Sequence, residues 1–408
     1  MLDNQTIEIV KSTAPLLQEN GEMITQHFYK RMFSHNPEVK QFFNTSNQAS
    51  GMQQKALAAA VVSYAENIDN LENLGEAIEL IAQKHASLQI KPEHYPIVGE
   101  NLLMTLKEVL GDTASDQVID AWNKAYNALA TILQNREAAI YKDNAQKTGG
   151  WEGFRQFQIV SKQEESSIIT SLYLQPEDGK PLPDFLPGQY ITLRVCLEDG
   201  HATMRNYSLS DIPSKPYFRI SVKREDGAVA AMPAGRVSNL VHKSFNIGNT
   251  VEIAPPCGQF VLKDIDLSNK PIVFIAGGIG ITPLISMLLD LTARKLHRQL
   301  VFIHCCINSD VQAFKNTLLE LEKNNSNLSV YFRYSQPDAQ DLKAGNNCSE
   351  GLISADFIRD VVKLIDAEYY FCGPGGFMKN IYSELTSNDV PKSQLHFEFF
   401  GPKQAITG

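Results

Sequence analysis

Residues 205–209 read Arg-Asn-Tyr-Ser-Leu, and they lie in a series of short segments with the alternating polarity of β-strands. The alternating run 191–195 precedes them, and the strand-like run 217–223 follows. A guanidinium group can hold a phosphate through two parallel hydrogen bonds, and a tyrosine ring can stack on a flat heterocycle while its hydroxyl stays polar. The pentapeptide alone also fits an ordinary exposed strand, so its interpretation depends on the segments around it.

The chain has 408 residues, too many for one ordinary domain, so we expect two or three domains. Its net charge of −9 argues against the basic surface of a nucleic-acid-binding protein and against attraction to an anionic membrane. The six cysteines show no C-x-x-C spacing, which argues against a zinc site or a disulfide framework and indicates a reducing compartment. No signal-peptide pattern is present at the start, so we expect a cytoplasmic protein without membrane insertion.

Residues 148–265 are expected to form an antiparallel β-barrel, because a glycine-rich break at 149–153 is followed by several short strand patterns. Pro-Gly-Gln-Tyr at 187–190, the pentapeptide and Gly-Arg-Val-Ser-Asn at 235–239 resemble the flavin-binding barrel of the ferredoxin-reductase family. The resemblance implies FAD, with an arginine on its phosphates and a tyrosine and a serine against its isoalloxazine ring. The FAD-binding residues that it predicts here are Tyr190, Arg205, Asn206, Tyr207, Ser208, Val237 and Ser238.

Residues 1–147 predict an almost entirely helical domain. One apolar stripe contains Leu74, Ile78, Ile81 and then His85, at intervals of four, three and four residues. His85 therefore lies on an apolar helix face. This spacing alone fits a buried core histidine as well as a metal ligand.

The order of residues along the helical domain resembles the bacterial globin fold. The resemblance implies haem b, with His85 as the proximal ligand of the iron. It places Tyr29 and Gln53 on the distal side as donors to dioxygen, and Phe43 and Leu57 in the haem pocket. The segments that carry it are Phe-Tyr-Lys-Arg-Met-Phe at 28–33, Pro37, Phe-Phe at 42–43, Gln53, Leu57, Lys-His at 84–85 and Tyr95.

Tyr95 and Glu137 match the residues that hold the proximal histidine in flavin-linked globins. A carboxylate that accepts the second imidazole N–H fixes the tautomer and makes the ring a stronger electron donor. From the residues alone, Tyr29 also fits a core aromatic, and Glu137 also fits a charge on a solvated face. The resemblance favours the catalytic set Tyr29, Gln53, Tyr95 and Glu137.

Residues 266–408 alternate strand and helix patterns, as in an α/β domain with a parallel sheet. The uncharged run 271–289 is long enough to cross a membrane, but glycines and Pro283 interrupt it, so a strand, a tight loop and a helix explain it better. We expect strands at 272–276, 300–306, 328–334 and 369–372, and helices at 284–291, 311–322 and 355–365.

Two glycine-rich loops follow the first and the last of these strands. The loop at 276–283 is not G-x-G-x-x-G, but its glycines let the backbone approach a pyrophosphate, and the helix that follows supplies N–H donors. In the ferredoxin-reductase family the second loop lies by the nicotinamide, and the end of the chain lies against the flavin. The resemblance therefore assigns NAD(P) binding to Gly277, Gly278, Ile279, Gly280, Ile281, Thr282, Pro283, Cys372, Gly373 and Pro374, and FAD binding to Glu398, Phe399, Phe400, Gly401 and Pro402.

A globin followed by this reductase resembles the arrangement of the flavohaemoglobins over the whole chain. The resemblance implies a multidomain fold: an all-α globin haem domain at 1–147, an antiparallel β-barrel FAD domain at 148–265 and an α/β parallel-sheet NAD(P)H domain at 266–408. It also implies a nitric oxide dioxygenase. NAD(P)H reduces FAD, FAD reduces the haem one electron at a time, and ferrous haem with bound dioxygen oxidises nitric oxide to nitrate. We expect a cytoplasmic monomer that acts in nitric oxide detoxification.

Two other functions stay open from the sequence. An oxygen-binding or sensing haem protein would explain His85 but would leave the reductase without a role. An NAD(P)H-dependent flavin, ferric or quinone reductase with an accessory haem would explain the last two thirds of the chain. For the electron donor we expect NADH over NADPH, because Asp310 follows the second strand of the α/β domain and no arginine lies between Asn308 and Phe314. A carboxylate there repels a 2′-phosphate.

Overall fold

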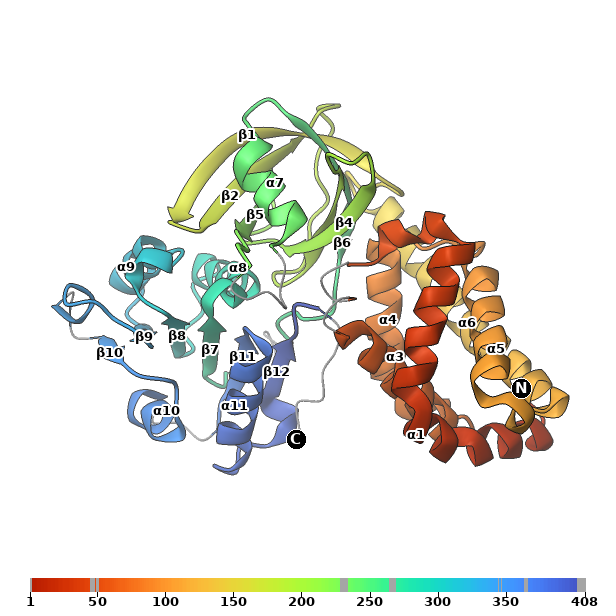
Figure 1. Cartoon of the computed structure of the whole chain (residues 1–408). Helices are drawn as coiled ribbons and strands as arrows, with labels where there is room; N and C mark the ends of the chain where they lie inside the picture. The colour runs from red at the N-terminus through yellow and green to blue at the C-terminus, as the bar shows by residue number, and fades with distance from the viewer. Residues whose placement is uncertain are drawn as a thin grey trace.

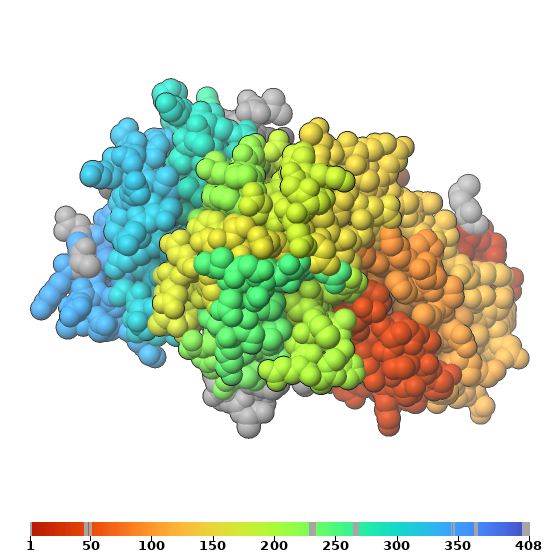
Figure 2. Space-filling view, turned by 90° about the horizontal axis from the view of Figure 1, so that it is seen from above, coloured from red at the N-terminus to blue at the C-terminus, as the bar shows by residue number. Residues whose placement is uncertain are grey.

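Three domains follow one another along the chain in the computed structural model (Figure 1), which describes residues 2–44, 48, 51–227, 234–263, 269–343, 345, 347–362 and 366–401. The β domain lies between the helical domain and the α/β domain, and Figure 2 shows the same order from above. The predicted fold class is therefore confirmed. None of the described helices is both long enough and apolar enough to cross a membrane.

The helical domain packs long helices against one another, and its two longest helices have capped starts. Asp3 accepts a hydrogen bond from the Thr6 N–H at the start of the first helix, and Ser115 accepts one from the Val118 N–H at the start of the last. The α-helices and the short 3-10 helices (η) are α1 (Asn4–His35), η1 (Pro37–Phe42), α3 (Met52–Glu66), η2 (Leu71–Leu74), α4 (Gly75–Ser87), α5 (His94–Leu110), η3 (Gly111–Thr113) and α6 (Asp116–Gln146).

The β domain is a six-stranded antiparallel sheet in the order β4-β3-β6-β1-β2-β5. A bridge between Leu209 and Ile220 joins its two ends, so the sheet closes into the expected barrel. The helix α7 (Arg236–Ser244) places Val237 and Val241 in the apolar core of this barrel. The strands are β1 (Arg155–Ser166), β2 (Ile169–Pro176), β3 (Tyr190–Cys196), β4 (Ala202–Ser208), β5 (Phe218–Lys223) and β6 (Thr250–Cys257).

The α/β domain is a six-stranded parallel sheet in the order β10-β9-β8-β7-β11-β12. Alternate side chains of its central strand enter different cores: Phe274 packs in the cluster that contains α8, and Val273 packs in the cluster that contains α11. The elements are β7 (Ile272–Gly277), η4 (Gly278–Gly280), α8 (Ile281–Ala293), β8 (Leu300–Cys306), η5 (Ser309–Val311), α9 (Lys315–Asn324), β9 (Leu328–Tyr334), η6 (Asp341–Lys343), β10 (Cys348–Glu350), α10 (Ala355–Val362), β11 (Glu368–Cys372), α11 (Gly375–Thr386), η7 (Lys392–Gln394) and β12 (Leu395–Glu398).

Two details of this domain differ from the sequence prediction. The strands β10 and β12 extend the sheet beyond the four expected strands. The helix expected at 311–322 begins only at Lys315. Phe314 has a φ of 59°, and this left-handed conformation separates α9 from η5. Residues 363–365, the expected end of a further helix, lie outside the described residues.

Side-chain hydrogen bonds join the domains. Asn206 of β4 donates to the Ser87 hydroxyl of α4 at 3.1 Å, and Ser286 of α8 donates to the carbonyl of Asp211 at 2.6 Å. The first contact links the helical domain to the barrel, and the second links the barrel to the α/β domain. The predicted cofactor residues lie beside both contacts.

Candidate functional site

The helical domain contains a buried carboxylate, that of Glu137, beside His85. Nδ1 of His85 lies 2.8 Å from Oε1 of Glu137 and 3.2 Å from the hydroxyl of Tyr95. The Tyr95 hydroxyl donates to the same Glu137 oxygen at 2.5 Å, so toward His85 it can only accept. The proton therefore lies on Nδ1, and Nε2 keeps the lone pair that a metal ion needs.

Burial explains why these groups stay together. Glu137 is 2% exposed, and burial, aided by the hydrogen bond to Glu137 and its charge, raises the pKa of Tyr95 far above its usual range. The neighbouring Arg136 pairs with Glu79 at 2.6 Å instead of with Glu137. The alternative that Glu137 sits on a solvated face is therefore wrong.

Tyr29, one of the two residues expected on the distal side, lies in an apolar cluster with Phe28 and Met32. Tyr29 is 6% exposed and packs against Phe43, with ring centroids 5.6 Å apart. Burial raises the pKa of Tyr29, and a hydrogen bond from Gln53 opposes that rise. Because the amide donates to the phenol oxygen, the phenol proton is free to point at a ligand. Leu57 packs against the same aromatic cluster.

These residues fit haem better than a bare metal ion. Within the described parts of the chain, no group of three His, Cys, Asp or Glu side chains could hold a metal ion. A metal bound by His85 would therefore need a prosthetic group to supply its other ligands. Oε1 of Gln53 is buried and has no partner among the described residues, so a ligand or water that donates a hydrogen bond would complete this pocket.

The pentapeptide lies where the barrel meets the helical domain. Nη2 of Arg205 donates to Oδ1 of Asn44 at 3.0 Å, and burial lowers the pKa of the Arg205 guanidinium. The ring of Tyr190 leaves no room for a side chain at Gly258, where a Cβ would lie 2.8 Å from it. Glycine at 258, with φ of 114°, is thus required by Tyr190.

Lys84 and Glu398 bring a pair of opposite charges to the same region. The Nζ atom of Lys84 lies 6.0 Å from the centroid of the Tyr190 ring. Burial raises the pKa of Glu398 to about 7, and the charge of Lys84 opposes that rise. Lys84 itself is accessible to solvent, yet the protein around it removes enough hydration to lower its pKa.

The other predicted FAD-binding residues differ in burial and in their contacts. Ser208 and Val237 are buried, and the Ser238 hydroxyl donates to the Gly235 carbonyl at 3.2 Å. Phe399 packs edge-on to Phe397, with ring centroids 5.9 Å apart. Phe400 is 47% exposed, Gly401 has a φ of 137°, and Pro402 lies outside the described residues.

The two predicted NAD(P) loops touch each other. A Cβ on Gly280 would lie 2.2 Å from the carbonyl oxygen of Cys372, and a Cβ on Gly373 would lie 3.0 Å from Cα of Gly277. Only glycines allow this approach. By contrast, a Cβ on Gly278 would meet nothing within 4 Å, so this side of the loop is open.

The remaining loop residues form the start of α8. Ile281, Thr282 and Pro283 are buried there. The Thr282 hydroxyl donates to the Ile279 carbonyl at 3.1 Å, so it holds the loop itself.

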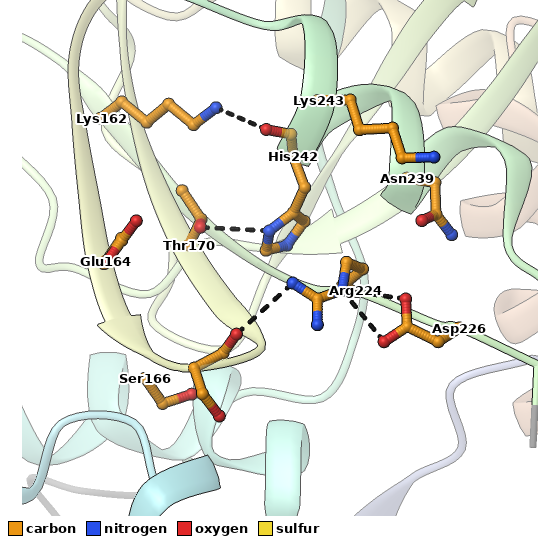
Figure 3. A pocket seen from close by; sticks show the side chains of 10 residues that line it. Lys162, Glu164, Ser166, Thr170, Arg224, Asp226, Asn239, His242 and Lys243 are labelled. Atoms are coloured by element: carbon orange, nitrogen blue, oxygen red, sulfur yellow. Dashed lines mark hydrogen bonds and ion pairs between the residues drawn. The ribbon is translucent and has the colours of Figure 1, made fainter.

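A pocket of about 450 Å³ lies elsewhere, between the β1–β2 hairpin and α7 (Figure 3). It shares no residue with the predicted cofactor sites. Two of its cationic groups already have partners: Nζ of Lys162 donates to the Phe245 carbonyl at 2.8 Å and so caps α7, and Arg224 pairs with Asp226 at 2.9 Å. We assign this pocket to the packing of the barrel.

Three domain families match the chain: Globin at residues 26–133, Oxidoreductase FAD-binding domain at 156–262 and Oxidoreductase NAD-binding domain at 274–382. A protein of Halalkalibacterium halodurans named Flavohemoprotein is 47% identical over 402 residues, which are 98% of this chain and 97% of the relative. The Flavohemoprotein of Rhodopirellula baltica is 47% identical over 406 residues, covering 100% and 99%. The chain belongs to the flavohaemoglobin family.

A solved structure agrees with this assignment. The flavohaemoglobin of Malassezia yamatoensis, crystallised with bound FAD and haem, matches with a TM-score of 0.85 and 26% identity, covering 98% of this chain and 100% of that one. The expected cofactors haem, FAD and NAD(P)H are therefore confirmed. As a flavohaemoglobin, the chain is an NAD(P)H-dependent oxidoreductase that carries haem and FAD.

Several residues of this flavohaemoglobin site were not predicted from the sequence. Asn44 contacts Arg205, Ser87 contacts Asn206, and Lys84 faces Glu398. Each of these residues belongs to the globin domain and acts on a residue of another domain. No local pattern marks such contacts, because they depend on how the domains pack.

Proposed function

We propose that the chain is an NAD(P)H-dependent nitric oxide dioxygenase. Its reaction joins two molecules of nitric oxide and two of dioxygen with the two electrons of one NADH, and yields two nitrate ions, NAD⁺ and one proton. The supporting observation is the buried carboxylate of Glu137, 2.8 Å from Nδ1 of His85. A carboxylate at this position makes the imidazole a stronger electron donor, which suits oxygen chemistry better than simple storage of oxygen.

In this proposal His85 holds the haem through Nε2, while Glu137 keeps the proton on Nδ1. Haem iron would supply the place where dioxygen and nitric oxide react, and it accepts one electron at a time. Tyr29 directs its O–H into the distal pocket and stabilises negative charge there, and Gln53 orients that hydroxyl. Phe43 and Leu57 exclude water from the same pocket.

The rest of the chain would deliver electrons. Hydride transfer moves two electrons together, whereas haem takes one, so a flavin is needed between them. In the proposal the loops at 277–283 and 372–374 hold the dinucleotide, and Arg205, Tyr207 and Ser208 hold the FAD. The position of the barrel between the other two domains supports this order (Figure 1).

Nitrate formation by the purified protein tests the proposal. With NADH, dioxygen and nitric oxide, we expect two nitrate ions for each NADH consumed. The matched control is His85→Ala, which should lose haem and nitrate formation while it keeps FAD and the reduction of ferricyanide by NADH. NADH consumption that yields no nitrate would favour a flavin, ferric or quinone reductase instead.

A further inference from the structure

His304 is a fully buried polar residue that the proposed reaction does not use. It lies in β8 and is 0% exposed. Its Nε2 atom lies 3.1 Å from the carbonyl oxygen of Gly278, in the first glycine loop. Its Nδ1 atom lies 3.3 Å from Nε2 of Gln312, and Oε1 of Gln312 lies 2.5 Å from the Tyr334 hydroxyl.

The partners of His304 determine which of its ring nitrogen atoms carries the proton. The Gly278 carbonyl can only accept, so Nε2 must carry a proton and donate it. Nδ1 of the neutral ring is then an acceptor, and the Gln312 amide donates to it. The Gln312 oxygen consequently faces the Tyr334 hydroxyl, which donates. Burial lowers the pKa of His304 to about 4, so the ring is neutral at physiological pH.

Cys306 holds the same loop from the same strand. Its Sγ atom lies 3.2 Å from Nε2 of His304, and the Gly278 N–H approaches its thiol closely enough to oppose the rise in its pKa that burial causes. The Gly278 carbonyl also accepts from the Ile281 N–H at the start of α8. The Gly278 carbonyl is thus held by two donors, and the Gly278 N–H lies near the Cys306 thiol.

Fixing this carbonyl also fixes the next N–H. In a trans peptide the C=O of Gly278 and the N–H of Ile279 point in opposite directions, and none of the described peptide bonds is cis. The carbonyl points inward to His304, so the Ile279 N–H points outward. A Cβ on Gly278 would meet nothing within 4 Å, so the loop is open at Gly278, the residue before this N–H.

We propose that His304 is a positioning residue for the pyrophosphate of the nicotinamide dinucleotide: its Nε2–H holds the Gly278 carbonyl inward, so that the Ile279 N–H faces the phosphate. This inference rests on the dinucleotide site proposed above. The outward N–H adds to the donors at the start of α8, where an anion is favoured. Without the imidazole, the Gly278 carbonyl would keep only the Ile281 N–H as a donor, and the peptide between Gly278 and Ile279 would be held less firmly, since glycine tolerates many conformations.

Two substitutions separate the two nitrogen atoms of the ring. In His304→Gln, the side-chain amide reaches the position of Nε2 and can still donate to Gly278. In His304→Asn, the amide reaches only the position of Nδ1, so the contact with Gln312 is kept and the donor to Gly278 is lost. We expect His304→Asn to raise the KM for NADH about tenfold, the effect of one hydrogen bond to a charged group, and His304→Gln to stay within about threefold.

Reduction of ferricyanide by NADH in the full-length protein is a suitable assay, because it needs neither haem chemistry nor nitric oxide. The kcat should change little in both variants. A second donor, dihydronicotinamide riboside, lacks phosphates. Its single-turnover rate of flavin reduction should be the same in wild type and in His304→Asn. Equal losses with NADH and with the riboside would overturn the proposal, as would an unchanged KM in His304→Asn.

Stability needs its own control. Asn327 donates to the carbonyls of Leu296 and Arg298 at 2.9 and 2.7 Å, at the amino ends of β8 and β9, whereas the glycine loops lie at the carboxyl ends of their strands. Asn327→Ala should lower the melting temperature without changing the KM for NADH. If His304→Asn fails to fold, Gln312→Leu still tests the network and should raise the same KM by a smaller factor; an unchanged KM there would count against the proposal. A wild-type protein that does not oxidise NADH would instead refute the dinucleotide site itself.

Discussion

Oε1 of Glu137 lies 2.8 Å from Nδ1 of His85, and it is the only charged partner of that imidazole among the described residues. Replacing the carboxylate by an amide keeps an acceptor of nearly the same shape but removes the charge. The proximal ring then donates less electron density to the metal.

Glu137→Gln should therefore keep haem and raise its midpoint potential. A change of about 1.4 kcal/mol corresponds to about 59 mV for one electron, and charge-assisted hydrogen bonds are typically of this size or larger. Spectroelectrochemical titration measures the shift. Tyr95→Phe should shift the potential less, because its hydroxyl is the longer contact to Nδ1, at 3.2 Å. An unchanged potential in Glu137→Gln would remove the carboxylate from the proximal role.

A second prediction concerns the stability of the protein as a function of pH. Burial raises the pKa of Glu398 to about 7, above its value of about 4.3 in an unfolded chain. The folded state then binds the proton more tightly, so this group contributes stability at low pH that is lost as the pH rises toward 7. Glu398→Gln should be more stable than the wild type near pH 8, and this difference should be smaller near pH 5.

Thermal melting at both pH values tests this prediction. Lys84→Met provides the matched change on the other side of the pair. Because Lys84 lowers the pKa of Glu398, its removal should move the loss of stability to higher pH. If Glu398→Gln differs from the wild type equally at pH 5 and pH 8, the carboxyl group does not titrate in this range.

The sequence predicted the elements in which apolar residues recur at a regular spacing. The capped, 31-residue helix α6 and the strand, glycine loop and helix at 272–293 follow from apolar spacing and from glycine. The strands β10 and β12 have three and four residues, too few to show a period. The αL conformation of Phe314 delays α9, and nothing in its neighbours predicts it.

Only part of the candidate site could be predicted from the sequence. His85, Tyr95 and Glu137 came from resemblance to globins, and the structure brings all three together. The contact of Arg205 with Asn44 spans 161 residues of sequence and joins two domains. Such contacts arise from the packing of finished domains, so residue patterns within one domain do not contain them.

A third prediction concerns the choice of NADH over NADPH. Asp310 lies in η5 directly after β8, it is exposed, and its carbonyl accepts a hydrogen bond from the Ser167 N–H at 3.1 Å, which holds the loop in place. A carboxylate there repels a 2′-phosphate. Asp310→Asn should lower the KM for NADPH while the KM for NADH changes little, as steady-state reduction of ferricyanide would show. A wild-type KM lower for NADPH than for NADH would contradict this role.

The last prediction concerns the distal hydroxyl. Tyr29→Phe should release dioxygen from the ferrous haem about tenfold faster, because bound dioxygen carries partial negative charge and a charge-assisted hydrogen bond is typically roughly 1.5–3 kcal/mol. Gln53 already contacts the Tyr29 hydroxyl and could take over part of its role, so we expect the lower end of this range. Phenylalanine keeps the packing against Phe43, so the haem content should stay the same.

Stopped-flow measurement of dioxygen release decides the role of Tyr29, and Tyr64→Phe is the matched control. Tyr64 is 4% exposed and donates to the Ala125 carbonyl at 2.8 Å, in a different apolar cluster of the same domain. Loss of the Tyr64 hydroxyl should lower stability and leave the dioxygen off-rate unchanged.

Turnover of Tyr29→Phe should fall mainly when dioxygen is scarce, because the weakened step is holding dioxygen until nitric oxide arrives. Electron delivery through the flavin should not change. An off-rate equal to that of the wild type would mean that Tyr29 only packs the core and that the distal pocket lacks its main donor.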